Sequence, residues 1–132
     1  MYSTFAERGT APTRAEVDEV TDGRSAEILS DLHDRHALVL GTDGDIRMAL
    51  PFSAGPTVHR VTSGKRSWWA NCAWDALAIP LMLGVDAGIE SVWADTGAVT
   101  RFEVRNGDLV DDAGTVHYSI PARRWWNDIV ET

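Results

Sequence analysis

Asn71-Cys-Ala-Trp-Asp-Ala-Leu-Ala-Ile-Pro-Leu-Met-Leu83 is the stretch around which the rest of the sequence is arranged. It is almost entirely apolar and predicts one central helix. Pro80 lacks the backbone N–H that a helix interior uses, so we expect a kink or a restart at that residue. Gly84 is well suited to end the helix.

Alternating apolar and polar residues on both sides of this helix predict short strands. The predicted strands cover residues 57–62, 89–94, 99–105, 109–110 and 115–120. Asn106-Gly107 is a favourable two-residue hairpin turn. Near the end, four residues fall at helical spacing: Trp125, Trp126, Ile129 and Val130. We therefore expect an α+β fold, in which a small antiparallel or mixed sheet packs on one central helix.

The N-terminal part of the sequence predicts helices followed by a hairpin. Thr13 and Glu16 form a capping box, in which each side chain accepts a hydrogen bond from the other residue's backbone N–H. After a second helix, a Gly41-Thr-Asp-Gly44 turn joins two predicted strands. Helices followed by a two-stranded wing are a winged-helix outline. We expect two domains, a winged-helix-like module over residues 1–55 and an α+β core over residues 56–132.

The composition argues against several classes of partner. The chain has 132 residues, 12 Lys and Arg against 20 Asp and Glu, and a net charge of -8. Such a chain repels the phosphates of nucleic acids and of membrane surfaces. It contains no apolar signal core and no run long enough to span a bilayer. We expect a cytoplasmic protein that binds a small molecule. The expected protein partner is a second copy of the chain, or another chain that completes its sheet.

Cys72 and Asp75 are the candidate reactive residues. Cys72 is the single cysteine of the chain, so it has no internal disulfide partner and stays reduced in the cytoplasm. In a helix, positions three apart share a face, so a thiol and a carboxylate at this spacing can exchange a proton. A thiol near a helix N-terminus also has its thiolate stabilised by the helix dipole. The alternative is structural, because a cysteine in an apolar helix is often a small core residue and an aspartate one turn later is often solvated.

Residues 64–80, Gly-Lys-Arg-Ser-Trp-Trp-Ala-Asn-Cys-Ala-Trp-Asp-Ala-Leu-Ala-Ile-Pro, resemble the active-site helix of the organomercurial (alkylmercury) lyases. The family pattern is an aromatic residue, then Ala-x-Cys-Ala-x-Asp-x-Leu, then Pro. Leu50-Pro-Phe-Ser53, Thr57-x-His-Arg-Val61 and Asp95-Thr-Gly97 are similar to flanking parts of the family. The resemblance extends over nearly the whole chain and is most specific around Cys72.

The resemblance implies a role for each of these residues. In the family, one thiolate binds mercury, an aspartate protonates the leaving carbon, and a second thiolate holds the released Hg(II). Cys72 matches the first cysteine and Asp75 the aspartate, so both are expected to contact mercury as substrate and product. Trp69 falls where the family often has an aromatic residue, and with Trp68 and Trp74 it is expected to form an apolar substrate pocket. No cofactor is implied.

The second cysteine of the family has no counterpart in the sequence. The expected protein is thus a short form that lacks this thiol and needs a replacement ligand or an external thiol to release Hg(II). Two other functions remain open. The protein could hold a soft metal ion or a small hydrophobic metabolite in a tryptophan-lined pocket without turnover. It could also use Asp75 as an acid or base in metabolite chemistry.

Overall fold

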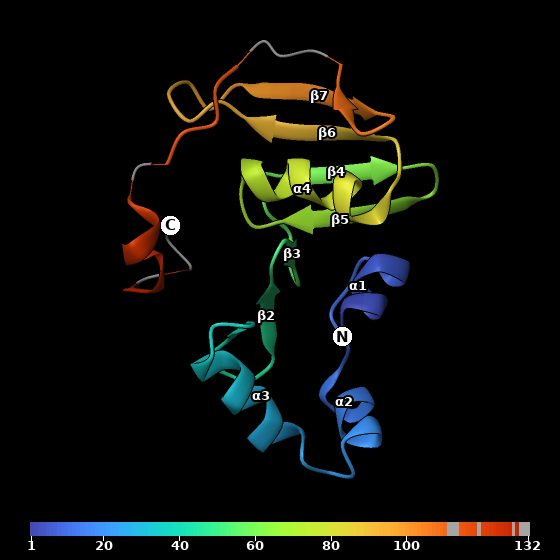
Figure 1. Cartoon of the computed structure of the whole chain (residues 1–132), viewed down its shortest axis with the longest axis vertical. Helices are drawn as coiled ribbons and strands as arrows, with labels where there is room; N and C mark the ends of the chain where they lie inside the picture. Colours follow the sequence, from blue (N-terminus) through green and yellow to red (C-terminus); the bar gives the residue numbers. More distant parts are fainter. Residues whose placement is uncertain (111–113, 119, 128, 130–132) are drawn as a thin grey trace.

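An eight-stranded antiparallel sheet forms the centre of the computed structural model, which describes residues 1–110, 114–118, 120–127 and 129 (Figure 1). Its strand order is β1-β2-β3-β5-β4-β6-β7-β8. The strands are β1 Val39–Leu40, β2 Ile46–Ala49, β3 Phe52–Ser53, β4 Arg60–Ser63, β5 Arg66–Ala70, β6 Ala87–Val92, β7 Val99–Arg105 and β8 Asp108–Leu109. The helices are α1 Tyr2–Arg8, α2 Arg14–Val20, α3 Ser25–Asp34, α4 Ala73–Leu83 and the 3-10 helix η1 Ala122–Asn127. The expected α+β class is confirmed.

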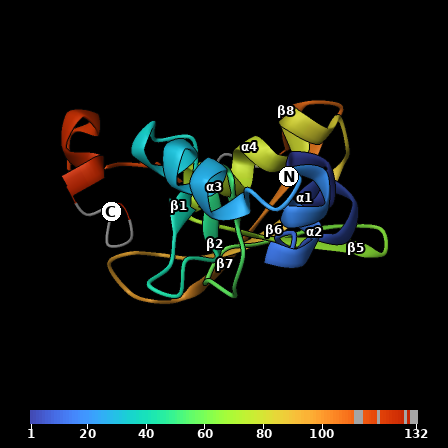
Figure 2. The same ribbon diagram turned by 90° about the horizontal axis from the view of Figure 1, so that it is seen from below.

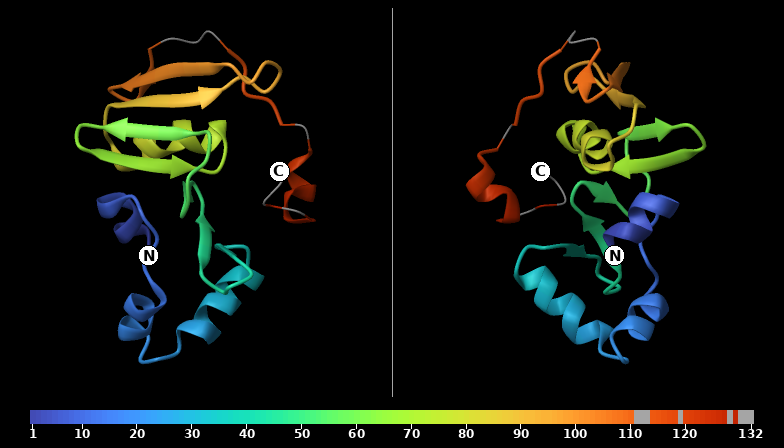
Figure 3. Two further views of the ribbon diagram at one scale, coloured as in Figure 1. Left: turned by 180° about the vertical axis from the view of Figure 1, so that it is seen from behind. Right: turned by 45° about the vertical axis from the view of Figure 1, so that its right-hand side comes forward.

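Helix α4 covers one face of the sheet, against β4 and β5 in the views from the front and from behind (Figures 1 and 3). Its buried residues are Ala76, Ile79 and Pro80. The helix continues past Pro80 to Leu83 and does not restart there. Gly84 ends it in the left-handed region, at φ 62, with its N–H bonded to the carbonyls of Pro80 and Leu81. The sheet thus holds α4 by an apolar face that includes the proline.

Three of the strands predicted after α4 are present, as β6, β7 and β8. Along β6, Ala87, Ile89 and Ser91 are buried while Gly88 and Glu90 are exposed, which is the alternation of a strand with one covered face. At the β7–β8 turn, the backbone φ angles of Asn106 and Gly107 are 52° and 82°. Positive φ at both central residues is what a tight hairpin of this kind requires.

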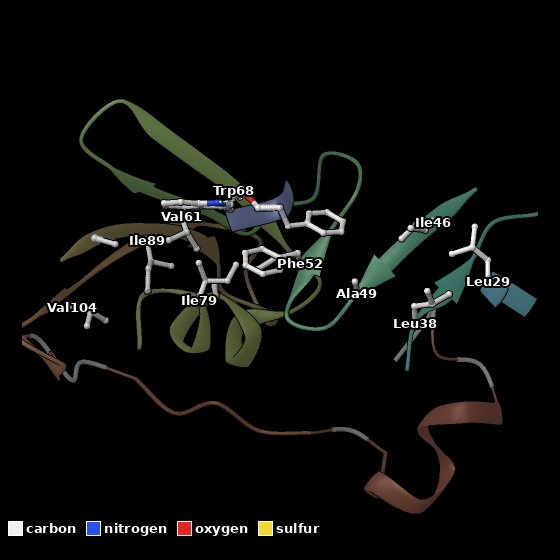
Figure 4. Packing of buried hydrophobic residues seen from close by; sticks show 14 residues of the cluster. Leu29, Leu38, Ile46, Ala49, Phe52, Val61, Trp68, Ile79, Ile89 and Val104 are labelled. Carbon is white, nitrogen blue, oxygen red and sulfur yellow. Dashed lines mark hydrogen bonds between the residues drawn. The ribbon is translucent and has the colours of Figure 1, made fainter. Parts of the chain in front are cut away.

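The sheet extends further toward the N-terminus than predicted. Strand β3 links the β1–β2 hairpin to the central strands, because Phe52 pairs with Ala70 and Ser53 with Trp69. The buried side chains therefore form one continuous core. It runs from Val104 through Val61, Trp68 and Phe52 to Leu38 and to Leu29 on α3 (Figure 4). The winged-helix description of residues 1–55 and the division at residue 55 stay predictions.

Helix α1 is an element that the sequence pattern did not indicate. Its Phe5 is fully buried and stacks on Phe52, with ring centroids 5.2 Å apart. The indole Nε1 of Trp68 donates a hydrogen bond to the carbonyl of Phe5 at 2.9 Å. The indole Nε1 also donates to the carbonyl of Ala6 at 3.3 Å, so an aromatic contact and this shared hydrogen bond hold α1 on the sheet. The capping box that begins α2 is confirmed, since Thr13 and Glu16 each accept from the other's backbone N–H.

Gly9 at the end of α1 offers a test of this docking. Its φ is 72°, and a Cβ at this position would lie 2.2 Å from the backbone carbonyl oxygen of Ser67. Gly9→Ala should therefore lower the free energy of unfolding by about 3 kcal/mol, from backbone strain and overpacking together. Gly23→Ala is the matched control, because Gly23 has φ 76° with no atom nearby. It should cost only about 1 kcal/mol. Urea denaturation of both variants measures the difference, and equal losses would contradict the docking.

The C-terminal part differs from the prediction. Residues 115–118 and 120 are not in a strand, and residue 119 lies outside the described residues. The described residues of this segment do not pair with the sheet through backbone hydrogen bonds. They contact the rest of the protein through side chains instead, as Tyr118 does with Trp74. Residues 122–127 form the 3-10 helix η1, which lies on the side of the molecule that carries β1 and α3 (Figure 2). The ring of Trp126 in this helix stacks on His36 near the end of α3, with ring centroids 3.9 Å apart. None of the helices in the described part of the chain is long and apolar enough to cross a membrane.

Candidate functional site

The turn between β5 and α4 determines the position of Cys72. Strand β5 ends at Ala70, whose N–H bonds to the carbonyl of His59 and whose carbonyl accepts from the Thr57 hydroxyl at 2.6 Å. The chain then turns, and Cys72 becomes the N-cap of α4 with extended backbone angles, φ −146° and ψ 176°. Its Sγ accepts a hydrogen bond from the backbone N–H of Asp75 at 3.4 Å. The thiol therefore lies at the N-terminus of α4, just before its first residue, Ala73. The sequence predicts a helix that begins two residues earlier, at Asn71.

Asp75 lies in the first turn of α4 and is half-buried. The Asn71 amide donates a hydrogen bond to its Oδ2 at 3.1 Å. The other amide atom of Asn71, Oδ1, is buried and has no hydrogen-bond partner among the described residues. Asn71 thus orients the carboxylate from the turn that also carries Cys72. No pattern in the sequence indicates this role of Asn71.

Both candidate reactive groups, Cys72 and Asp75, have raised pKa values, which favours their protonated forms. Burial raises the pKa of the Cys72 thiol, and the negative charge of Asp75 raises it further. The N–H groups of Asp75 and Trp74 lower it, but they do not outweigh burial. Burial also raises the pKa of Asp75, against the lowering effect of hydrogen bonds from Asn71 and Cys72. The expected stabilisation of a thiolate by the helix N-terminus is therefore present but is not the dominant effect.

The three tryptophans expected to line one pocket do not share a surface. Trp68 is 1% exposed and belongs to the core. Trp69 follows it on β5, so it points to the opposite face of the sheet, where the Arg60 guanidinium lies 5.5 Å from its ring centroid. Trp74 on α4 is 56% exposed. The reason is local geometry, since neighbouring residues of a strand cannot face the same side.

Tyr118 is a second residue of this region that sequence reasoning missed. Its ring lies edge-on to Trp74, with centroids 6.5 Å apart, and 4.9 Å from the ring of Trp125. Partial burial raises the pKa of Tyr118, and the charges of Cys72 and Asp75 raise it further. The C-terminal segment thus passes close to the N-terminus of α4. This contact spans more than forty residues of sequence, so no local pattern could have indicated it.

The coupling between the two groups can be tested by alkylation. Asp75→Asn removes the negative charge that raises the pKa of Cys72, so a larger fraction of the thiol should ionise at pH 8. We expect Cys72 to react severalfold faster with iodoacetamide in this variant, as measured by mass spectrometry over time. Asp34→Asn, which changes an exposed carboxylate at the end of α3, should react like the unmodified protein. An unchanged or slower rate in Asp75→Asn would show that the two groups are not coupled.

The family of the chain follows from comparison with known proteins. A family model for alkylmercury lyase (MerB) matches residues 52–132, which include Cys72, Asp75 and all of α4. The chain belongs to the alkylmercury lyase family. This confirms the resemblance around residues 64–80.

The chain resembles the crystal structure of the mercury-bound form of MerB2, which is one of several similar solved structures. The two share 29% sequence identity, and the TM-score is 0.66. The match covers 81% of this chain and 53% of that chain, so the present chain spans about half the length of MerB2. No curated protein matches the sequence. In the described part of the present chain, no group of three or more His, Cys, Asp or Glu side chains is arranged to hold a metal ion.

Proposed function

We propose that the protein cleaves carbon–mercury bonds by protonolysis, with Cys72 as the mercury-binding thiol and Asp75 as the proton carrier. The observation that carries the proposal is the first turn of α4. There the N-cap thiol of Cys72 accepts a hydrogen bond of 3.4 Å from the backbone N–H of Asp75, whose carboxylate lies in the same turn. Membership of the alkylmercury lyase family supports it.

The first step forms the sulfur–mercury bond. Sulfur is the ligand that soft metals such as mercury prefer. Because burial and Asp75 raise the pKa of Cys72, the thiol carries its proton at neutral pH. As Sγ binds the mercury atom, this proton moves to the neighbouring Asp75 carboxylate. Asp75 is suited to accept it, since burial raises the pKa of this carboxyl group.

The second step breaks the carbon–mercury bond. Asp75 delivers the proton to the carbon, the electron pair of the carbon–mercury bond forms the new C–H bond, and mercury remains on Cys72. Cys72–SH and R–Hg–X thus give Cys72–S–Hg–X and R–H, with no oxidant or reductant. The Asn71 amide keeps the Asp75 carboxylate oriented through its hydrogen bond to Oδ2.

Release of Hg(II) requires an external thiol in this proposal. Cys72 is the single cysteine of the chain, so an exchange reaction with a small thiol replaces the second protein thiolate. Such thiols are abundant in the cytoplasm, which also keeps Cys72 reduced. We therefore propose a cytoplasmic enzyme whose partners are an organomercurial and a small thiol.

Methane release from methylmercury tests the proposed reaction. The reduced protein is incubated with methylmercury and excess small thiol, and methane is measured by headspace gas chromatography against thiol alone. We expect methane well above the thiol background and in excess of the protein present. Stoichiometric uptake of mercury without methane would contradict the proposal and would favour a protein that binds soft metals without turnover.

A further inference from the structure

A cavity of about 500 Å³ lies beside the N-terminus of α4. Helix α4 contributes Ala73 and Leu77 to its wall, and β6 and β7 contribute Ser91, Thr100 and Phe102. The volume is within the range of small-molecule binding sites, roughly 300–1,000 Å³. Ala73 is the residue directly after Cys72, so the cavity adjoins the proposed reactive site without including Cys72 or Asp75 in its lining.

The walls of the cavity suit a flat apolar group. Trp93 and Phe102 both line it, and their rings meet edge to face with centroids 6.1 Å apart and an interplanar angle of 83°. On the far side, Gly114 lies so close to Trp93 that an added Cβ would be 2.5 Å from the indole ring. Aromatic rings prefer such edge-to-face and offset arrangements. A third ring can therefore pack against this pair with favourable geometry.

The wall is mostly apolar, but it also includes the polar side chains of Asp95, Thr115 and His117 and one hydrogen-bonded polar pair. The Nδ1 of His59 and the Oγ of Ser91 are 2.8 Å apart, and Ser91 is only 2% exposed. Burial lowers the pKa of His59, so its imidazole is neutral at neutral pH. Its other nitrogen, Nε2, makes no hydrogen bond with any described residue. This pair can therefore exchange a hydrogen bond with a ligand but offers no charge to an anionic one.

We propose that this cavity binds an uncharged aromatic group that carries one hydrogen-bonding atom, and that His59 bonds to that atom. Two sources share this chemistry. One source is the organic group of a mercurial bound to Cys72, and this alternative rests on the proposed function. The other source is a free small molecule, and this alternative is independent of the proposed function.

Binding of 2-naphthol measured by isothermal titration calorimetry tests the proposal without any cleavage reaction. The protein should bind 2-naphthol at one site and discriminate against the anion 2-naphthalenesulfonate. Thr100→Phe fills the cavity and should abolish binding. Thr62→Phe on β4 is the matched control, because Thr62 is exposed and is not part of the lining. His59→Phe removes Nε2 and should weaken binding roughly three- to tenfold, the size of one hydrogen bond.

Val116→Phe is a second filling variant, in the exposed segment of the lining, and keeps the test valid if Thr100→Phe does not fold. The proposal is overturned if the unmodified protein does not bind 2-naphthol, if it binds the sulfonate equally well, or if the folded filling variants bind like the unmodified protein.

Cleavage of phenylmercury and methylmercury by the filling variants then identifies the source of the aromatic group. A selective loss of phenylmercury cleavage supports the organic group of the mercurial, and an unchanged ratio of the two rates supports a free ligand. Failure to cleave either mercurial would contradict the proposed function alone.

Discussion

Cys72→Ser should abolish hydrocarbon release from organomercurials, with a loss of about a thousandfold or more. A serine hydroxyl is a hard oxygen ligand and does not replace sulfur in binding mercury. The substitution should leave the fold intact, because serine is among the preferred N-cap residues and its Oγ can accept the N–H bond that Sγ accepts from Asp75. Chromatography of the released hydrocarbon and the melting temperature of the variant measure the two effects separately.

The result would be decisive because the sequence contains no other cysteine. Mercury bound by the unmodified protein but not by Cys72→Ser must be held by this sulfur. A folded Cys72→Ser variant that releases hydrocarbon at the normal rate would show that the reaction occurs elsewhere on the protein or in solution.

Asp75→Asn should separate mercury binding from carbon release. The asparagine has nearly the same shape and can still accept the hydrogen bond from Asn71, but it cannot carry the proton. Loss of a positioned proton carrier reduces a reaction roughly a hundred- to ten-thousandfold. We therefore expect the variant to take up one organomercurial on Cys72 and to release little hydrocarbon. Mass spectrometry of the intact adduct and chromatography of the product measure both quantities.

The control for this variant is Asp34→Asn, which removes an equal charge from an exposed position on α3. It should bind and cleave like the unmodified protein. If Asp75→Asn also cleaves normally, another group supplies the proton. If it fails to bind the mercurial, Asp75 is needed to hold mercury and its role is not limited to proton transfer.

Much of the fold could be predicted because it depends on local patterns. The capping box at Thr13, the alternation along β6 and the Asn106-Gly107 turn each specify their own structure within a few residues. Cys72 and Asp75 are only three residues apart, so the sequence could also predict that they lie close together. The start of α4 differs from the prediction, because the thiol caps the helix and does not lie within it.

The rest depends on contacts between distant segments. The docking of α1 relies on Trp68, which is more than sixty residues away, and the joining of β3 to β5 extends the sheet across the predicted domain boundary. The His59–Ser91 pair forms because β4 and β6 pair with Arg60 opposite Glu90. The direction of the Cys72 pKa shift likewise reflects burial by the folded chain, which no spacing of residues reveals.

The central claim is that one thiol and one carboxylate suffice for cleavage, with an external thiol needed only for turnover. Benzene release from phenylmercury by the reduced protein, first without and then with added small thiol, tests it most directly. We predict about one benzene per Cys72 without the thiol and continued release after the thiol is added. No benzene in the first stage, or the same amount from Cys72→Ser, would contradict the account.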